Sequence, residues 1–392
     1  MGFSFKNLFR KEKNDEVGII NEQKTLYYDR TKIDETGAAY RIIIGTRSNG
    51  KSYSICKTIV ENYLNEGKRS CYIRRYEEQI KPKTIQTLFN PHLDLIETLS
   101  GGEWNWVIYR ANCFYLAYYD EFEDKITKKD EVPFCITRSV NTWETTKGAD
   151  VGEISLICYD EFLTREAYLK DEFVCFMNLL SSLIRDRKDC IIYMLANTVN
   201  KYSPYWQEFG IEGIEKMKQG EIRVYEYPNS KMKLAIEYCA AANTTKEVND
   251  NFFAFENAQL QVIKTGAWEM ANYPRAPYKI YDQDILKCFY IYFNGQMICG
   301  EIVHPTYGKY KNDLFIFFHR QTKDIEIDYL TPFYSQQPTT SICHVRYLQD
   351  QPTELHKLIV KLIMKNHMFF SDNEVGEIVR NFLLEQGVKN IL

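Results

Sequence analysis

The sequence lacks the segments that place a protein in or across a membrane. No apolar run approaches the roughly 20 residues that a membrane-spanning helix requires. The opening segment MGFSFKNLFRKEKN is too short and too charged for a secretory signal peptide, and Lys6 breaks the myristoylation pattern that an initial Met-Gly can begin. We therefore expect no membrane partner, and we interpret the first residues as an exposed arm.

Cysteine pairs are missing as well. The 11 cysteines include no C-x-x-C motif, and none of the 6 histidines stands at zinc-site spacing from a cysteine pair. Most cysteines occur within apolar runs such as ICYDEF and FVCFM, where a thiol acts as a small buried hydrophobic group. This pattern argues against a disulfide-stabilised secreted protein and indicates a reducing cytoplasm.

An excess of charge of one sign is also absent. The formal net charge is −4 and the isoelectric point is about 6.0, which excludes a protein that is basic all over but permits a local nucleic-acid-binding surface. The sequence contains neither repeats nor low-complexity segments. What remains is a chain of 392 residues, 45% hydrophobic and 15% aromatic, which is long enough for two domains with strand-rich cores.

A glycine-containing loop between a strand and a helix is the strongest motif. The apolar run over 40–44 predicts a buried strand, and apolar residues at helical spacing over 52–66 predict a helix that Gly67 ends. Between them stands GTRSNGKS, which fits the Walker A pattern G-x-x-x-x-G-K-[ST]. A further strand over 69–75 completes a strand–loop–helix–strand unit, so we expect parallel strands.

The residue types in this loop suit nucleotide phosphates and a magnesium ion. Glycines allow successive backbone N–H groups to point at phosphate oxygens, and the following helix adds its N-terminal dipole. We expect Lys51 to contact the β- and γ-phosphates and Ser52 to ligate Mg²⁺. Arg47 can approach the phosphates or swing to a neighbour, or it remains solvated at the tip of the loop. The predicted nucleotide-binding residues are Gly45, Thr46, Arg47, Ser48, Asn49, Gly50, Lys51, Ser52 and Tyr53.

A pair of acidic residues follows the buried strand predicted over 154–159. Asp160 stands at the carboxyl end of this strand, where it can hold the hydration shell of Mg²⁺. Glu161 can orient and deprotonate the attacking water. Because neighbouring residues of a strand point to opposite sides, we expect the two carboxylates to act separately.

Two further polar features flank the next buried strand, predicted over 190–196. Asn197 follows it and can sense the γ-phosphate or the attacking water, although a simple asparagine turn has the same pattern. The basic segment RDRK precedes it and is either a solvated surface or the source of a cation that reaches a neighbouring subunit's γ-phosphate. Arg185 and Arg187 are the candidates for this catalytic role, and Lys147 is a weaker one.

The remaining pattern divides the chain into two blocks joined by a polar connector that is broken by prolines. An Asn294-Gly295 pair in the second block predicts a tight hairpin turn. The other predicted elements are an antiparallel meander over 104–138, a helix over 171–184, paired strands over 222–227 and 232–238, a helix over 249–263, a strand over 288–293, and helices over 354–367 and 373–386.

The combination of these segments resembles the DNA-encapsidation ATPases of small tailed phages, which are compact relatives of terminase large subunits. The segments that carry the resemblance are GTRSNGKSY, LICYDEF and RDRKDCIIYMLANTVNKYSPYW. They cover the chain from about residue 40 to residue 240. Beyond that range the resemblance is architectural.

The resemblance implies an α/β fold, in which a P-loop ATPase domain of the additional-strand, catalytic-glutamate type with a parallel-core sheet precedes a smaller α+β, RNase H-like domain. It implies ATP and Mg²⁺ as cofactors, with Lys51, Ser52, Asp160, Glu161 and Asn197 in the matching positions. It also implies a homomeric ring, usually a pentamer, on the portal of a phage procapsid in the host cytoplasm. There, ATP hydrolysis would drive double-stranded DNA inward.

The C-terminal block departs from full terminases, whose nuclease holds two metal ions in a carboxylate cluster. The first strand of that core should carry a central Asp, but residues 288–293 read CFYIYF. Asp324, Glu326 and Asp328 alternate as in a solvated edge strand. We therefore predict an ATPase domain over 1–242, a partly helical linker over 243–283 and a vestigial nuclease domain over 284–392.

Other functions remain consistent with the sequence. The nearest alternative is a terminase large subunit with an active C-terminal nuclease. Another is a nucleotide-gated assembly protein with little turnover, against which the intact Glu161 argues. Cellular ring motors for conjugation or segregation are a further alternative, although the sequence shows no membrane anchor for them.

Overall fold

The structure, a computed structural model, describes most of the chain. The described residues are 28–47, 49–146, 152–185, 187, 189–227, 229–230, 232–239, 268, 271–306, 311, 313–321, 331–335, 344–345 and 353–388. The helix predicted over 249–263 lies outside them, as do Ser48, Lys147, Asp324, Glu326 and Asp328. Within the described part of the chain, no helix is both long and apolar enough to cross a membrane.

A mixed sheet of 10 strands forms the centre of the first part of the chain. Its strand order is β3-β4-β6-β2-β7-β8-β1-β10-β9, with β5 paired to β4. The strands from β6 to β10 in this order run parallel, as predicted, whereas the flanking pairs are antiparallel. The strands are β1 (Tyr40–Gly45), β2 (Arg69–Arg74), β3 (Trp106–Arg110), β4 (Cys113–Asp120), β5 (Lys125–Lys129), β6 (Cys135–Ser139), β7 (Ile154–Asp160), β8 (Ile191–Asn197), β9 (Ile222–Tyr227) and β10 (Met232–Tyr238).

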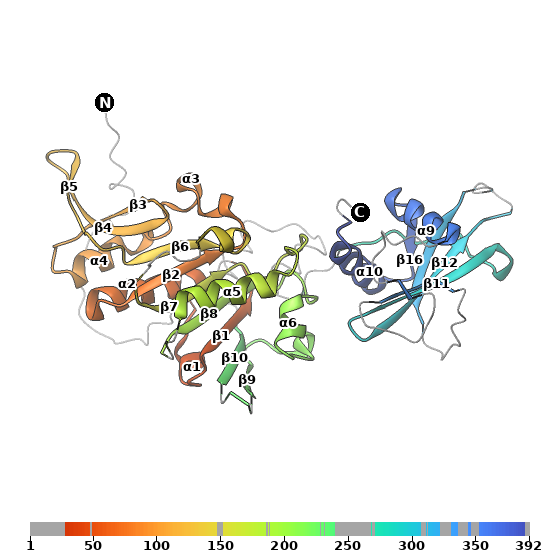
Figure 1. Cartoon of the computed structure of the whole chain (residues 1–392), viewed down its shortest axis with the longest axis horizontal. Coiled ribbons are helices and arrows are strands. Elements are labelled where there is room, and N and C mark those ends of the chain that lie inside the picture. Colours follow the sequence, from red (N-terminus) through yellow and green to blue (C-terminus); the bar gives the residue numbers. More distant parts are fainter. Residues whose placement is uncertain are drawn as a thin grey trace, which may run out of the picture.

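Helices cover both faces of this sheet (Figure 1). α2 and α4 pack on one face, and α5 and α6 pack on the other. Every residue of β1 is buried, because a central parallel strand is covered on both sides. The helices are α1 (Thr31–Asp34), α2 (Lys51–Glu66), α3 (Pro82–Ile85), α4 (Leu93–Leu99), α5 (Glu172–Ile184) and α6 (Pro204–Glu208). Short 3-10 segments are Glu77–Ile80, Asn90–His92, Val140–Thr146 and Ile214–Lys216.

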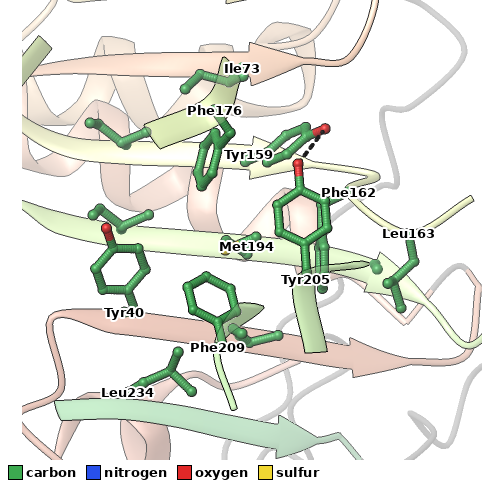
Figure 2. Close-up of a cluster of buried hydrophobic side chains, with 14 of the residues drawn as sticks. Tyr40, Ile73, Tyr159, Phe162, Leu163, Phe176, Met194, Tyr205, Phe209 and Leu234 are labelled. Carbon is green, nitrogen blue, oxygen red and sulfur yellow. Dashed lines mark hydrogen bonds between the residues drawn. The ribbon is translucent and has the colours of Figure 1, made fainter. Parts of the chain in front are cut away.

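The core between the sheet and α5 is rich in aromatic rings, as Figure 2 shows. Tyr159 of β7 packs against Phe176 of α5 with ring centroids 4.9 Å apart. Phe162 meets Tyr205 of α6 edge to face at 5.4 Å. Edge-to-face pairs add stability beyond the area that they bury, and together these ring contacts join β7 and the residues just after it to both helices of this face.

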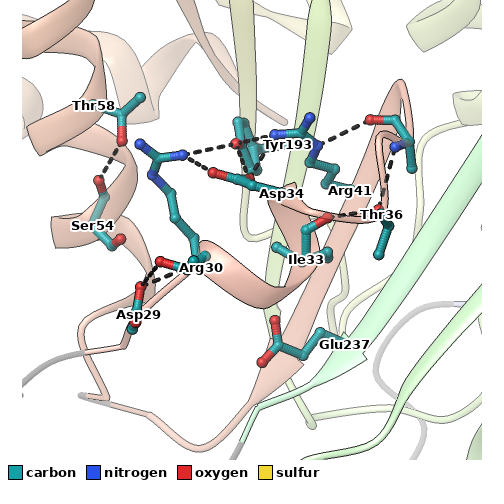
Figure 3. Close-up of polar contacts among 12 residues, drawn as sticks. Asp29, Arg30, Ile33, Asp34, Thr36, Arg41, Ser54, Thr58, Tyr193 and Glu237 are labelled. Atoms are coloured by element: carbon teal, nitrogen blue, oxygen red, sulfur yellow. Dashed lines mark hydrogen bonds and ion pairs between the residues drawn. The ribbon is translucent and has the colours of Figure 1, made fainter.

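A buried polar cluster fixes the chain just before β1 (Figure 3). Arg41 of β1, which is 8% exposed, donates to Asp34 Oδ1 at 2.6 Å and to the Tyr193 hydroxyl at 2.7 Å. Tyr193 of β8 donates in turn to Asp34 Oδ1 at 2.6 Å. Because the buried Arg41 charge is paired with the half-buried Asp34 and hydrogen-bonded, the core can hold it, and the cluster joins α1 to two central strands.

A 6-stranded mixed sheet follows in the C-terminal part, with the order β15-β14-β11-β12-β13-β16. β11, β12 and β13 are antiparallel neighbours, whereas β14, β15 and β16 join by parallel pairing. α9 and α10 cover one face of this sheet. The elements are β11 (Ile285–Phe293), β12 (Gln296–Val303), β13 (Phe315–Arg320), β14 (Phe333–Ser335), β15 (His344–Val345), α9 (Glu354–Met364), β16 (Met368–Phe370) and α10 (Asn373–Glu385), with a 3-10 turn at Asp282–Asp284.

Two local predictions in this part have different outcomes. The hairpin turn is present, since Asn294 and Gly295 have φ values of 47° and 74° and join β11 to β12. The helix predicted over 354–367 is wrong at its end, because α9 stops at Met364. Asn366 then turns the chain with φ 54°, and the next residues form β16 beside β13.

Candidate active site

The carboxyl ends of β1, β7 and β8 lie side by side and bring the predicted site residues together. Gly45 at the end of β1 pairs with Asn197 at the end of β8, and Asp160 of β7 pairs with Leu195 of β8. The loop after β1 leads directly into α2, which begins at Lys51. The parallel sheet therefore gathers the three predicted motifs at one edge, where ligands of α/β sheets bind.

Two glycines of this loop occupy positions that a larger side chain would disturb. Gly50 has φ 87°, in the left-handed region. At Gly45 an added Cβ would lie 2.4 Å from Cys239 Sγ. The loop is held in this shape because the Asn49 side chain donates to Cys239 Sγ at 2.8 Å and the Asn49 carbonyl accepts from Tyr28 N at 2.9 Å.

Lys51 points into the loop rather than into solvent. Its Nζ donates to the Thr46 carbonyl at 2.7 Å, to Asn49 Oδ1 at 3.1 Å and to Asn197 Oδ1 at 3.2 Å. Burial lowers the pKa of Lys51 from its ordinary value. An anion in the loop would oppose this effect by favouring the charged ammonium.

Asp160 gathers several donors around one carboxylate oxygen. Its Oδ2 accepts from Ser52 Oγ at 3.0 Å, from Arg74 Nη1 at 3.3 Å and from the Tyr72 hydroxyl. Ser52 comes from α2, and the two other donors come from β2, the neighbour of β7. Ser52 and Asp160 thus present adjacent oxygen atoms, the ligand type that Mg²⁺ prefers.

Glu161 lies just beyond the end of β7 and has φ 58°, in the left-handed region. Its Oε2 accepts from Arg74 Nη2 at 2.6 Å, so one guanidinium bridges Glu161 and Asp160. The prediction that the two acids point to opposite sides is therefore wrong, because strand geometry ends at Asp160. The Glu161 side chain is 52% exposed, and water can reach its carboxylate.

A buried network supports the chain behind Glu161. Arg75 donates to the Glu161 carbonyl at 3.3 Å and through Nε to Glu172 Oε2 at 2.9 Å. Glu172, in the first turn of α5, also accepts from the hydroxyls of Tyr159 at 3.0 Å and Tyr205 at 2.9 Å. These two hydroxyls are joined by the dashed line in Figure 2. The network connects the position of Glu161 to the core beneath α5.

Arg185 and Arg187 lie near the amino end of β8, at the end of the strands opposite the glycine-containing loop. They precede β8, whereas Asn197 ends it, and the strand of 7 residues spans about 20 Å. Arg185 is exposed after α5 with φ 53°, and Arg187 pairs with Asp189 at 3.1 Å. This placement separates both guanidinium groups from the loop of their own chain. Either arginine could therefore contact phosphates only if these were bound in the loop of a second subunit.

The remaining predicted loop residues differ in their surroundings. Arg47 is exposed, and the ring of Tyr53 lies 4.3 Å from that of His92. Ser48 belongs to the part of the chain that is not described. The roles of Arg47 and Tyr53 in phosphate binding stay predictions.

Tyr72, Arg74 and Arg75 are the site residues that sequence analysis missed. All three lie at the carboxyl end of β2 or just after it, within the predicted strand over 69–75. The available signal was the pair of arginines at the end of the predicted strand. Their partners could not be inferred, because they depend on the position of β2 beside β7.

The segment after Asn197 connects this edge of the sheet with α10 of the C-terminal part. Asn200 Nδ2 donates to Asn381 Oδ1 at 2.7 Å, and Lys201 Nζ lies 3.0 Å from Glu374 Oε1. Both asparagines are buried. Because a buried amide pair tolerates little displacement, this contact ties the end of β8 to α10.

The residues at this edge fit a phosphate group and a divalent cation. The Thr46 hydroxyl is buried in the loop and has no hydrogen-bond partner among the described residues, as expected where a ligand supplies the partner. Lys51 adds a cation aimed at the same space, and α2 begins there with its N-terminal dipole. Ser52 and Asp160 add the oxygen pair that suits magnesium.

Comparison with known proteins agrees with this arrangement. A family model described as "Podovirus DNA encapsidation protein (Gp16)" matches residues 22–231. The DNA packaging protein of Bacillus phage phi29 is 24% identical over 200 residues, which are 50% of this chain and 52% of that protein. The DNA packaging protein of Bacillus phage B103 is 26% identical over 172 residues, 43% and 47% of the two chains. The matched segment thus spans about half the length of these curated relatives.

A solved structure extends the similarity of fold over nearly the whole chain. The chain in "The bacteriophage Phi-29 viral genome packaging motor assembly" matches with a TM-score of 0.51 and 15% identity, covering 92% of this chain and 100% of that one. The resemblance inferred from the motifs is confirmed by the family match. Since that match covers more than half of the residues, the chain belongs to the Podovirus DNA encapsidation protein (Gp16) family.

Proposed function

We propose that this protein is an ATP-driven motor subunit that moves double-stranded phage DNA into a preformed procapsid. One observation carries the enzymatic part, namely that Lys51, Ser52, Asp160, Glu161 and Asn197 meet at one edge of a parallel sheet. Membership of a DNA encapsidation family supports DNA as the cargo. The curated relatives are DNA packaging proteins, which supports the portal and the procapsid as partners.

The proposed cofactors are ATP and Mg²⁺. Bound magnesium supplies charge neutralisation on the phosphates during transfer. Ser52 Oγ and Asp160 hold it, while Lys51 and the backbone N–H groups of residues 45–50 bind phosphate oxygens. Asn197, whose amide oxygen now contacts Lys51 at 3.2 Å, is positioned to detect whether the γ-phosphate is present.

Glu161 is the proposed general base, which orients the attacking water and takes its proton. The Arg74 guanidinium competes for the same carboxylate oxygen at 2.6 Å. This contact occupies the carboxylate oxygen that would otherwise accept a hydrogen bond from the attacking water. We therefore propose that Arg74 moves away from Glu161 before hydrolysis, so that the structure represents a resting arrangement of the site.

The proposal predicts DNA-stimulated ATP hydrolysis by the purified full chain. Lys51→Ala should lower the turnover by at least about 100-fold, because it removes a preorganised cation from the phosphates. Lys57→Ala is the matched control, since Lys57 lies on the same helix with 48% of its side chain exposed. Turnover should be measured with and without double-stranded DNA and procapsids.

Two outcomes of this experiment would contradict the proposal. Unchanged turnover in Lys51→Ala would show that the phosphate loop is not the hydrolytic site. Negligible turnover of the wild-type chain in the presence of DNA and procapsids would favour a nucleotide-gated assembly protein. A loss of turnover in Lys51→Ala is distinguished from misfolding by comparing the thermal unfolding of Lys51→Ala and Lys57→Ala.

We also propose a homomeric ring, a pentamer by resemblance, docked on the portal in the host cytoplasm. Arg185 or Arg187 then completes the site of a neighbouring subunit, because both lie at the edge of the sheet opposite their own loop. One of the two variants Arg185→Ala and Arg187→Ala should lower the ATP turnover by about 100-fold or more, because it removes the guanidinium that contacts the neighbouring subunit's phosphates.

A mixing experiment separates this role in trans from a role within one chain. Chains carrying the inactivating arginine variant keep an intact loop, and Lys51→Ala chains keep intact arginines. Mixed rings should therefore regain part of the turnover that each variant lacks alone. Absence of any recovery at all mixing ratios would contradict a role in trans for that arginine.

The C-terminal part is proposed to be a vestigial RNase H-like domain without nuclease activity. The antiparallel unit β11–β12–β13, extended by parallel β14 and β15, supports this fold. Neither β11 nor its parallel neighbour β14 carries a carboxylate.

The proposed limits are 1–242 for the ATPase domain, 243–283 for the linker and 284–392 for this domain. Cutting of plasmid DNA by the full chain with Mn²⁺ would instead favour a terminase with an active nuclease.

A further inference from the structure

One face of the C-terminal sheet carries metal-ligand side chains that the proposed motor chemistry does not use. Cys288 lies on β11, Cys299 and Glu301 on β12, and His319 on β13. The antiparallel register pairs Cys288 with Glu301 and Cys299 with His319. Paired residues share a face, and residues two apart on one strand share it as well. All four side chains therefore project from the same face of three adjacent strands.

The ligand atoms of this group are close together. One ligand atom each of Cys288, Cys299 and Glu301 lies within 4.8 Å of the others. His319 Nε2 lies 3.3 Å from Glu301 Oε1. A tetrahedral zinc ion with bonds of about 2.0–2.3 Å places its ligand atoms roughly 3.5 Å apart, so small side-chain rotations are enough to close the group around an ion.

The imidazole of His319 is oriented for a cation. Its Nδ1 lies 3.0 Å from the Arg320 carbonyl, which can only accept, so Nδ1 carries a proton. Nε2 is then left facing the Glu301 carboxylate. Unprotonated Nε2 and Glu301 Oε1 are both hydrogen-bond acceptors. At 3.3 Å from each other, they need either a second proton on the imidazole or a cation between them. A backbone carbonyl that holds the far nitrogen is the usual outer partner of a metal-bound histidine.

We propose that Cys288, Cys299, Glu301 and His319 form a zinc-binding site on the C-terminal sheet. Two thiols with an imidazole and a carboxylate select zinc over magnesium or calcium, which prefer sites made of oxygen atoms alone. The ion can enter from solvent, because the side chains of Glu301 and His319 are 17% and 30% exposed.

The proposed site is structural. Phe289 and Ile291 of β11 project to the other face, where they pack in the core with α9 and α10. The zinc ion therefore links three central strands on the face opposite these helices. Because the ligands come from strands that are neighbours only in the folded state, binding stabilises the folded C-terminal part.

The test uses the purified full chain, kept reduced, with Co²⁺ as a spectroscopic probe and Zn²⁺ as its competitor. We expect one Co²⁺ per chain, with a thiolate-to-metal absorption band and the visible bands of a tetrahedral ion, both abolished by added Zn²⁺. Cys288→Ser and Cys299→Ser should each weaken binding by about 10-fold or more. The matched control is Cys175→Ser, since Cys175 is a half-buried thiol on α5.

Two results would overturn the proposal. They are the absence of the thiolate band in the wild-type chain, and equal binding in the wild type and both serine variants. If a serine variant fails to fold, His319→Gln replaces it, because this side chain is partly exposed. ATP hydrolysis takes no part in the readout, so the result is independent of the proposed motor function.

Discussion

Glu161→Gln is expected to lower the ATP turnover number by about 10²–10⁴-fold, the range that a positioned general base contributes. The amide keeps the size of the side chain but cannot take a proton from water. Nucleotide binding should remain close to that of the wild type, because Lys51 and Ser52 are untouched. The measurement is DNA-stimulated hydrolysis together with the dissociation constant of a fluorescent ATP analogue.

Glu166→Gln is the matched control for this prediction. Glu166 is an exposed acid in the loop that follows β7, so neutralising it changes the net charge by the same amount without touching the site. Its turnover should equal that of the wild type. If Glu161→Gln retains wild-type turnover, the general base is another group. The ion pair of Arg74 with Glu161 would then have no role in activating the attacking water.

Glu172→Ala is expected to lower the free energy of unfolding by about 3–5 kcal/mol, as found when one partner of a buried ion pair is removed. Glu172 is 2% exposed and Arg75 is 4% exposed, so the arginine would be left buried and unpaired. The hydroxyls of Tyr159 and Tyr205 would lose an acceptor at the same time. Denaturant-induced unfolding of the purified chain measures this loss.

A second pair of variants gives this prediction its controls. Glu208→Ala removes an exposed carboxylate of α6 and should change the stability by less than about 0.5 kcal/mol. The double variant Arg75→Met with Glu172→Leu should recover much of the loss, since it leaves no unpaired charge in the core. A loss below about 1 kcal/mol in Glu172→Ala would show that solvent or another group satisfies Arg75.

Local sequence signals were sufficient for most strands and for the loop. The strands predicted over 222–227 and 232–238 coincide with β9 and β10, because alternating residues flank a clear turn. The apolar run before Gly45 coincides with β1, and the run before Glu161 with β7. Once parallel strands were expected, the meeting of Lys51, Asp160 and Asn197 followed from their positions, since Asp160 and Asn197 end their strands and Lys51 follows the loop after β1.

Contacts that depend on the order of strands could not be predicted in this way. Nothing local indicates that β2 lies beside β7, so the bridge from Arg74 to both acids was missed. The left-handed backbone of Glu161 has no sequence signature either. The cysteines at 288 and 299 lack zinc-motif spacing for the same reason, since strand pairing rather than chain spacing brings them to His319.

The contact of Asn200 with Asn381 joins the end of β8 to α10. Asn197 and Asn200 belong to one short turn, which touches Lys51 at one end and α10 at the other. If Lys51 binds nucleotide as proposed, a shift of this turn that alters its contact with Lys51 would also alter the contact with α10, and thermodynamic linkage would make the coupling reciprocal. Tension that pulls α10 away from this turn would then change the affinity for nucleotide, as in a load sensor.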